Sequence, residues 1–310
     1  MKISRIILCV LIASLLLPGC GSGTEQEEDT SVKTGAKLVI NADTNSGGTL
    51  PQGVDAQGIF HFVDAFGESY EVEYHADWSQ HSYEPDGFVH DGYACTYEDE
   101  NYLSRLGIDV SHHQGDIDWS RVKAAGYDFA ILRIGYRGYG AEGKICQDER
   151  FETYAKGALE AGLDIGVYFF SQAVSEAEAK EEAEACIGWL SEAGISADDL
   201  AFPVTFDPES ILDEEARTDD VSGQQFTKNC IAFCEEMKRE GYQPMIYANM
   251  KWEAFMLDLS ALEDYPIWYA DYEEVPQTPY AFCMWQYAED ASVDGVSGAV
   301  DTNLYLEAKQ

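Results

Sequence analysis

The stretch Ile165–Phe206, IGVYFFSQAVSEAEAKEEAEACIGWLSEAGISADDLAFPVTF, decides the fold class of this 310-residue chain. It opens with the apolar run Ile165–Phe170, whose length and aromatic content are typical of a buried strand. Ser175 and Glu178 then form a capping box ahead of a segment with apolar residues at helical spacing. The apolar run Phe202–Phe206 follows as a second strand. A strand, a crossover helix and a strand predict a βαβ unit and a parallel sheet.

The same alternation extends outward in both directions. Further helices are expected at about 119–125 and 150–161 and from Ser222, and further strands at Leu106–Val110, Phe129–Ile134, Met245–Ala248, Ile267–Ala270, Phe282–Tyr287 and Ala299–Asn303. About eight strands with fewer helices in residues 101–310 predict an α/β fold, an irregular (β/α) barrel whose last helices are shrunken or missing. An open doubly wound sheet is the alternative. No Gly-x-Gly-x-x-Gly turn follows the first strand, which counts against a nucleotide site.

The first residues have the pattern of an export signal. Lys2 and Arg5 precede the apolar run Ile6–Leu17, which is too short to span a bilayer comfortably. We therefore expect residues 1–19 to be a signal peptide and the protein to be exported.

The end of that run points to a lipid anchor. Leu17-Pro18-Gly19-Cys20 resembles the lipobox of bacterial lipoproteins, so we expect Cys20 to be lipidated. Residues 20–37 are rich in Gly, Ser, Thr, Glu and Asp, and they are interpreted as an acidic tether. An ordinary signal peptide with an incidental cysteine is the alternative. The expected location is the cell membrane, through the lipid anchor, with the protein facing the cell wall.

Residues 38–100 are predicted to form a small β-rich module. Phe60–Val63 and the alternating run Tyr70–Tyr74 flank Phe66-Gly67-Glu68, a pattern typical of a hairpin. A unit this small is stable only if it packs on its neighbour.

Composition excludes some classes of function. The chain carries 57 acidic and 19 basic residues, a net charge of −38, whereas a nucleic-acid binder needs a basic surface. The cysteines show no Cys-x-x-Cys and no zinc spacing. They are interpreted as small buried hydrophobes, with disulfides of undetermined pairing as the alternative.

Acids stand where several predicted strands end. Asp109, the pair Asp207 and Glu209, Asp271 and Asp301 come from four different strands. The C-terminal rim of an α/β barrel carries its catalytic groups. Asp207 and Glu209 lie two apart in an extended segment, so their side chains point the same way. Because acids are abundant here, chance is the alternative explanation.

Clustered carboxyl groups cannot all ionise easily, so one becomes a proton donor while another stays anionic. Cleavage of a glycosidic bond requires this combination. Aromatic residues near the same strand ends could stack on sugar rings, although packing within the core explains many of them. The candidates for substrate contact are Tyr168, Tyr247, Trp268 and Trp285.

Eight motifs in order along the chain resemble the N-acetylmuramidases of glycoside hydrolase family 25, a group of lysozymes. The matching stretches are Asp109–Trp119, Arg133–Gly140, Gly166–Ser171, Asp207-Pro208-Glu209, Met245–Asn249, Ile267–Tyr272, Trp285-Gln286-Tyr287 and Asp301-Thr302-Asn303. Each is weak by itself, but together they are highly specific. The resemblance covers residues 105–306 and not residues 20–100.

The resemblance implies an irregular (β/α) barrel that cleaves the β-1,4 bond between N-acetylmuramic acid and N-acetylglucosamine. It implies that Glu209 is the proton donor and that Asp207 steadies the substrate's 2-acetamido group as internal nucleophile. Asp109 and Asp271 match supporting acids, and Asp301 matches a further acid at the groove edge. Pro208 departs from the bulky or aliphatic residue usual there, but proline leaves the flanking side chains free. The family pattern suggests no metal and no cofactor.

The expected partners are peptidoglycan glycan strands and, through the anchor, the membrane; no nucleic-acid partner is expected. One alternative is a surface lipoprotein that binds glycan without cutting it, which need not keep the acids. Another is a glycosidase acting on a different N-acetylated polysaccharide such as chitin.

Overall fold

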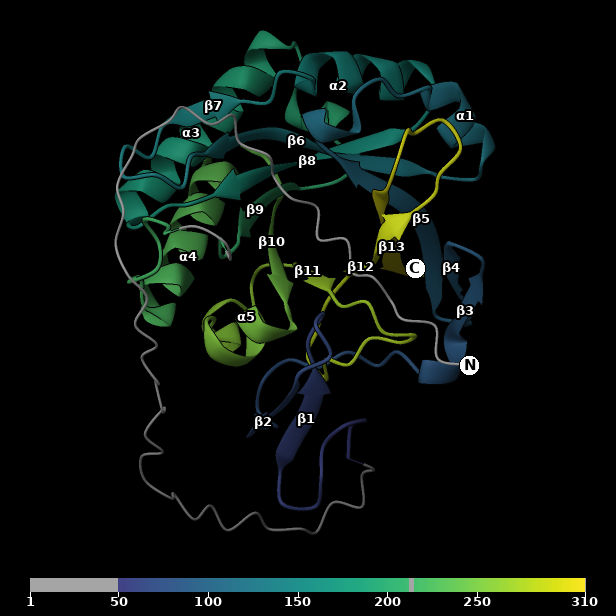
Figure 1. Cartoon of the computed structure of the whole chain (residues 1–310), viewed down its shortest axis with the longest axis vertical. Helices are drawn as coiled ribbons and strands as arrows, with labels where there is room; N and C mark the ends of the chain where they lie inside the picture. Colours follow the sequence, from purple (N-terminus) through teal and green to yellow (C-terminus); the bar gives the residue numbers. More distant parts are fainter. Residues whose placement is uncertain (1–49, 212–214, 310) are drawn as a thin grey trace, which may run out of the picture. The chain divides into compact units, whose positions relative to one another are not determined.

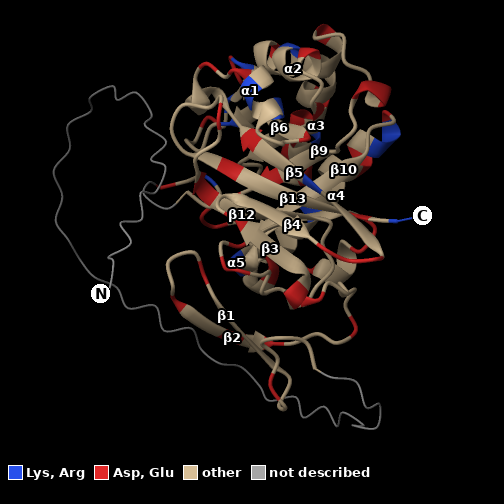
Figure 2. Ribbon diagram, turned by 90° about the vertical axis from the view of Figure 1, so that its right-hand side faces the viewer, with Lys and Arg blue, Asp and Glu red and all other residues tan. Residues whose placement is uncertain are grey.

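The computed structural model describes residues 50–211 and 215–309. The expected signal peptide, Cys20, the tether and the first residues of the β-rich module lie outside the described residues. Among those that are described, none of the helices is both long and apolar enough to span a bilayer. Acidic residues are spread over helices, loops and hairpins (Figure 2).

Eight strands close into a barrel, as expected, and the open-sheet alternative is wrong (Figure 1). The strands are β5 (Tyr102–Val110), β6 (Phe129–Arg137), β8 (Asp164–Ser171), β9 (Val204–Pro208), β10 (Pro244–Asn249), β11 (Ile267–Ala270), β12 (Met284–Ala291) and β13 (Val300–Ala308). Their order around the barrel is β5-β13-β12-β11-β10-β9-β8-β6, and β6 pairs with β5 to close it. The short strand β7 (Ile145–Gln147) adds to β6.

The expectation of parallel strands is wrong for the last strand. Neighbouring strands from β5 through β12 pair in parallel, but β13 runs antiparallel to both β12 and β5. A parallel crossover needs a dozen or more residues, usually including a helix. Only residues 292–299 connect β12 to β13, and no helix lies among them. The chain therefore turns back directly.

The helices cover one part of the barrel wall. They are α1 (Trp119–Ala124), α2 (Phe151–Glu160), α3 (Glu176–Glu192), α4 (Gly223–Arg239) and α5 (Met250–Phe255). Half of the capping box predicted before α3 is present, since the Ser175 side chain accepts from the Glu178 amide. The Glu178 carboxylate accepts from the amide of Val174, one residue before the N-cap, and not from that of Ser175. Within the described residues, no α-helix follows β11 or β12, as the loss of late helices predicted.

Two hairpins precede the barrel, and the one nearer to it in sequence packs where helices are missing. The predicted hairpin is confirmed as β1 (Ile59–Val63) and β2 (Ser69–Glu73), and a second consists of β3 (Phe88–Asp91) and β4 (Ala94–Tyr97). Phe88 packs edge-on against Trp285 of β12, with ring centroids 5.2 Å apart. Phe282 stacks obliquely on Tyr269 of β11 and contacts Tyr83, which precedes β3. Residues 50–101, called the hairpin segment below, thus bury the outer face of β11 and β12.

Large side chains fill the barrel interior below its C-terminal end. Phe129 and Phe202 stack with ring centroids 4.2 Å apart, and Met245 and Trp268 belong to the same buried cluster. Gly107 of β5 faces this cluster, where a Cβ atom would overlap the Phe129 ring. The interior is therefore a packed core that supports whatever lies at the rim above it.

Gly107→Ala should lower the free energy of unfolding by about 1–3 kcal/mol, because the buried Phe129 ring has no space to yield. Gly188→Ala is the matched control. It lies in α3, exposed, with open space around its Cβ position, and should gain about 0.5–1 kcal/mol from helix propensity. Urea unfolding followed by circular dichroism measures both. Equal stability of the two variants would contradict the packed interior.

Candidate active site

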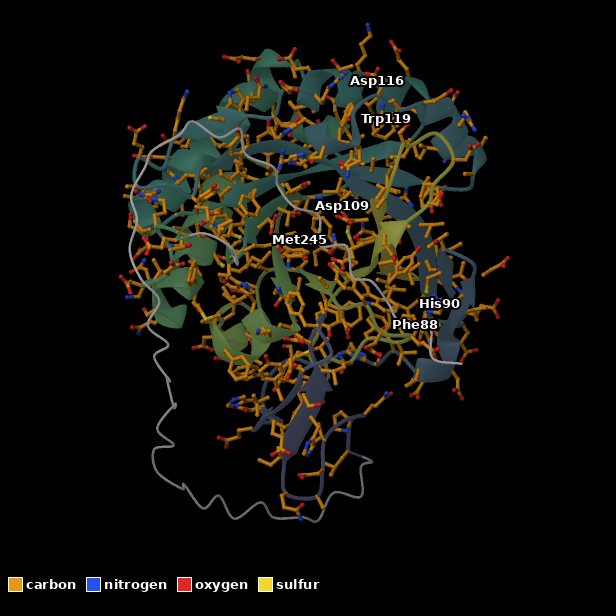
Figure 3. The ribbon with its side chains drawn as sticks, viewed as in Figure 1. Phe88, His90, Asp109, Asp116, Trp119 and Met245 are labelled. Carbon is orange, nitrogen blue, oxygen red and sulfur yellow. The ribbon has the colours of Figure 1, made fainter. Side chains whose placement is uncertain are left out.

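Four acids lie together at the C-terminal end of the barrel. Asp109 is near the end of β5, and Glu209 lies one residue beyond Asp207 and Pro208, which end β9. Asp301, near the start of β13, stands opposite Asp109 in the strand register. Because β13 is antiparallel to β5, its first residues lie beside the last residues of β5. Figure 3 labels Asp109 within the ring of strands, above Met245 of the interior.

Two amide side chains hold Asp109 in place. Gln286 Nε2 and Asn303 Nδ2 each donate to Asp109 Oδ2 at 2.8 Å. Burial raises the pKa of Asp109, while the two hydrogen bonds oppose that rise. Burial and the neighbouring Asp109 charge also raise the pKa of Asp301 well above its usual range. The rim is therefore a place where negative charge is disfavoured and protons are retained.

Alternation along β9 directs Asp207 into the barrel. Phe206 packs outward on Phe233 of α4, with ring centroids 4.9 Å apart, so Asp207 faces inward. Burial, followed by the Glu209 and Asp109 charges, raises the pKa of Asp207 well above its usual range. Its Oδ1 atom is buried and has no hydrogen-bond partner among the described residues. An unpaired buried oxygen is costly, and a ligand that donates a hydrogen bond would relieve that cost.

Glu209 is poised to exchange a proton near neutral pH. Burial is the main cause that raises its pKa, to about 7, with further contributions from Asp109 and Glu289, while the nearby Tyr247 hydroxyl opposes the rise. Two adjacent carboxyl groups whose pKa values are both raised do not ionise together easily, so one keeps its proton while the other can be anionic. The pair can therefore supply a proton donor next to a potential anion.

Arg133 brings a positive charge to this acidic rim. It is buried on β6, where its Nε donates to Asp148 Oδ2 at 2.8 Å. Its charge opposes the rise in the pKa of Asp207. The sequence reasoning assigned it no role. The available signal was a cation in the middle of a largely apolar strand, within a matched motif.

Three predicted aromatic contacts lie below and beside the acids. Tyr168 and Tyr247 stand edge-on to Trp268, with ring centroids 6.1 and 5.1 Å away. Trp268 is 1% exposed, and its Nε1 donates to Asn303 Oδ1 at 2.8 Å. Tyr168 is half-buried and Tyr247 buried. Trp268 is therefore the floor of the site, and the two tyrosines are its walls.

The structure does not bring Asp271 and Trp285 into this group. Trp268 and Ala270 of β11 face the interior, so Asp271 points outward, where its carboxylate accepts from the Tyr269 hydroxyl at 2.8 Å. Trp285 is fully buried against the hairpins, and its Nε1 donates to the Asp271 carbonyl at 2.8 Å. In this structure both residues anchor the loop after β11.

Further residues at the rim escaped the sequence reasoning. Gln286, besides holding Asp109, accepts from the hydroxyls of Tyr247 at 2.9 Å and Tyr272 at 3.1 Å. Asn303 links the floor to Asp109. Gln286 and Asn303 lie in the same matched motifs as Trp285 and Asp301, which was the signal that could have identified them. Nothing in the sequence showed which residue of each motif faces inward.

No cluster of three or more His, Cys, Asp or Glu in residues 50–211 and 215–309 is arranged to hold a metal ion. Six cysteines among them are free thiols, in agreement with the interpretation as small hydrophobes: Cys95, Cys146, Cys186, Cys230, Cys234 and Cys283. The carboxyl groups at the rim can transfer protons and stabilise a positive centre.

Comparison with known proteins agrees with this arrangement. The family model for glycosyl hydrolases family 25 matches residues 108–296. The autolytic lysozyme of Clostridium acetobutylicum is 27% identical over 65% of this chain, and lysozyme M1 of Streptomyces globisporus is 31% identical over 64% of it. The chain spans 56% and 67% of those proteins. A bacterial lysozyme structure from Streptomyces coelicolor aligns with a TM-score of 0.53 at 27% identity, covering 65% of this chain and 91% of that one.

Proposed function

Since the chain belongs to glycosyl hydrolases family 25, we propose that it hydrolyses the β-1,4 bond between N-acetylmuramic acid and N-acetylglucosamine in peptidoglycan. The observation that carries the proposal is the pair at the end of β9. Glu209, with a pKa of about 7, stands beside Asp207, whose Oδ1 has no partner among the described residues. The two relatives named as lysozymes support the same bond.

The proposed first step uses the substrate's own 2-acetamido group. Its carbonyl oxygen bonds to the anomeric carbon as the glycosidic C–O bond breaks, and the leaving oxygen takes the proton of Glu209. Asp207 accepts the acetamido N–H through Oδ1 and faces the positive charge that develops. Arg133, held by Asp148, favours the anionic form that Asp207 needs for this role.

The proposed second step returns the enzyme to its starting state. The Glu209 carboxylate removes a proton from water, and the water oxygen replaces the acetamido oxygen at the anomeric carbon. The sugar ring is positioned by a wall and floor of aromatic side chains, Tyr168, Tyr247 and Trp268. Two further acids, Asp109 and Asp301, keep the rim acidic.

Glu209→Gln should fold normally and lose roughly 10²–10⁴-fold in kcat, because the leaving oxygen loses its proton donor. Glu152→Gln, an exposed change on α2, is the control and should match the wild type. Release of reducing ends from purified peptidoglycan and from chitin measures turnover, and mass analysis of fragments identifies the bond. A folded Glu209→Gln variant with a near wild-type rate would contradict the assignment of Glu209 as the proton donor. Faster turnover of chitin would point to the other polysaccharide.

Activity should fall as pH rises through about 7, because the general acid Glu209 must be protonated and its pKa is raised to that value. Tyr247→Phe should move this basic limb to higher pH, since the nearby Tyr247 hydroxyl lowers the pKa of Glu209. Steady-state kcat/KM across pH for both proteins is the measurement. A basic limb that stays in place, or moves to lower pH, in Tyr247→Phe would contradict this origin.

We also propose that the protein is exported and lipid-anchored through Cys20, on the strength of Leu17-Pro18-Gly19-Cys20 and the acidic segment behind it. Cys20→Ala should release the protein from membranes, because it removes the thiol that carries the acyl chains. Fractionation and immunoblotting detect the shift. Retention of the variant in the membrane fraction would place the anchor elsewhere.

A further inference from the structure

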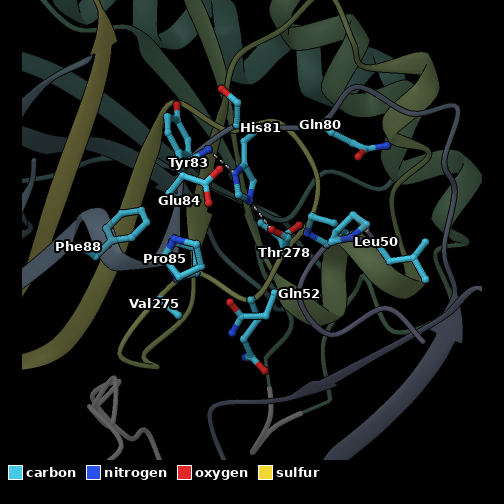
Figure 4. Close-up of a pocket in the computed structure, with 15 residues that line it drawn as sticks. Leu50, Gln52, Gln80, His81, Tyr83, Glu84, Pro85, Phe88, Val275 and Thr278 are labelled. Carbon is cyan, nitrogen blue, oxygen red and sulfur yellow. Dashed lines mark hydrogen bonds between the residues drawn. The ribbon is translucent and has the colours of Figure 1, made fainter. Parts of the chain in front are cut away.

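A cavity of about 420 Å³ lies between the hairpin segment and the loop that follows β11 (Figure 4). Gln52, His81, Tyr83 and Glu84 line it from one side, and Val275–Pro279 line it from the other. The hairpin side lies outside the residues that the family model matches, 108–296. The cavity is therefore a feature that this chain adds beside the family's barrel.

The same loop connects this cavity to the acidic rim. Tyr272 donates its hydroxyl to Gln286 Oε1 at 3.1 Å, and Gln286 in turn holds Asp109. Val275 follows three residues later and already lines the cavity. Three residues of chain reach at most about 11 Å, so the cavity wall begins within that distance of the Tyr272 backbone. The loop Tyr272–Val275 therefore spans from the rim to the cavity wall.

Most polar groups in the cavity wall are already paired. His81 Nδ1 accepts from the Tyr83 amide at 3.0 Å, which leaves its Nε2 to donate to the Thr278 carbonyl at 2.8 Å. This pairing describes a neutral imidazole, and burial lowers the pKa of His81. The Gln277 side chain pairs with the backbone of Val63, accepting and donating at 2.9 Å. These groups shape the wall and are not free for a ligand.

Glu84 is the one acidic side chain among the fifteen residues that line the cavity. Its carboxylate is exposed and accepts no hydrogen bond from any described residue. No Lys or Arg is among the fifteen residues that line the cavity, so its charge is not neutralised there. Four prolines supply rigid apolar surface around it, namely Pro51, Pro85, Pro276 and Pro279. A single anion beside rigid proline surface, in a cavity whose lining is otherwise uncharged, favours an extended ligand with aliphatic carbons and an ammonium group.

We propose that this cavity binds the peptide stem of peptidoglycan, with the side-chain ammonium of the stem's basic residue paired to Glu84. The inference rests on the proposed function, because a stem is attached to each N-acetylmuramic acid and so hangs beside the bond that is cut. The glycan lies over the rim, and the stem runs along the loop from Tyr272 to Val275. The hairpins thereby make the enzyme selective for peptide-bearing glycan.

Two synthetic stem peptides that differ only at the third residue, lysine or norleucine, test the pairing. The full chain should bind the lysine peptide roughly 2–5-fold more tightly, the range of a solvent-exposed ion pair. Glu84→Gln should abolish the difference. Glu98→Gln, an exposed change outside the cavity, should keep it. Calorimetric or NMR titration measures the six affinities, two peptides on each of three proteins. Absence of binding, equal affinities in the wild type, or a difference that survives Glu84→Gln would overturn the proposal.

Turnover separates this proposal from the proposed function. For the wild type, KM should be lower for intact peptidoglycan than for glycan strands stripped of their peptides, and Glu84→Gln should bring the two values together. If the wild type cleaves both substrates with equal KM, the stem site is wrong and the glycosidase function stands. If it cleaves neither, the proposed function itself fails.

Discussion

Closure of the barrel by β13 is the constraint on which the rest of the structure depends. Eight residue pairs, from Asp301 opposite Asp109 to Ala308 opposite Tyr102, join β13 to β5. Because the two strands are antiparallel, an acid at the start of one reaches an acid near the end of the other. Asn303 of the same strand accepts from Trp268 and donates to Asp109, so one strand connects the floor of the site to its rim.

Ionising several buried carboxyl groups at this rim costs free energy. Burial raises the pKa of Asp109, Asp207 and Glu209, and each ionised group makes the next harder to ionise. Amide donors on Asp109 and the Arg133 charge near Asp207 offset part of that cost. The cost that remains is useful, because a carboxyl group that keeps its proton near neutral pH is a general acid.

The hairpin segment covers the outer face of the late barrel strands, over which the described residues place no helix. A barrel strand without a covering helix would leave its outer face in water, and β11 and β12 carry large aromatic residues there. Phe88 and Tyr83 from the hairpin segment contact Trp285 and Phe282 and complete this core. Asp271 and Gln277 bond to each other, and Gln277 bonds to the Val63 backbone, so the same contacts fix the loop that leads from the rim. Stability and the shape of the binding surface are therefore coupled in this region.

Local signals in the sequence determined the strands, the capped helices and the arrival of acids at strand ends, because periodicity and capping act within a few residues. They predicted Asp109, Asp207, Glu209 and Asp301 together. Only the tertiary structure decided the rest. The face of β11 that turns inward places Trp268 in the site and Asp271 outside it. That orientation depends on the register with neighbouring strands. The reversal of β13, the inward turn of Gln286 and the burial of Trp285 under the hairpins depend on contacts between residues far apart in the chain, which no local pattern encodes.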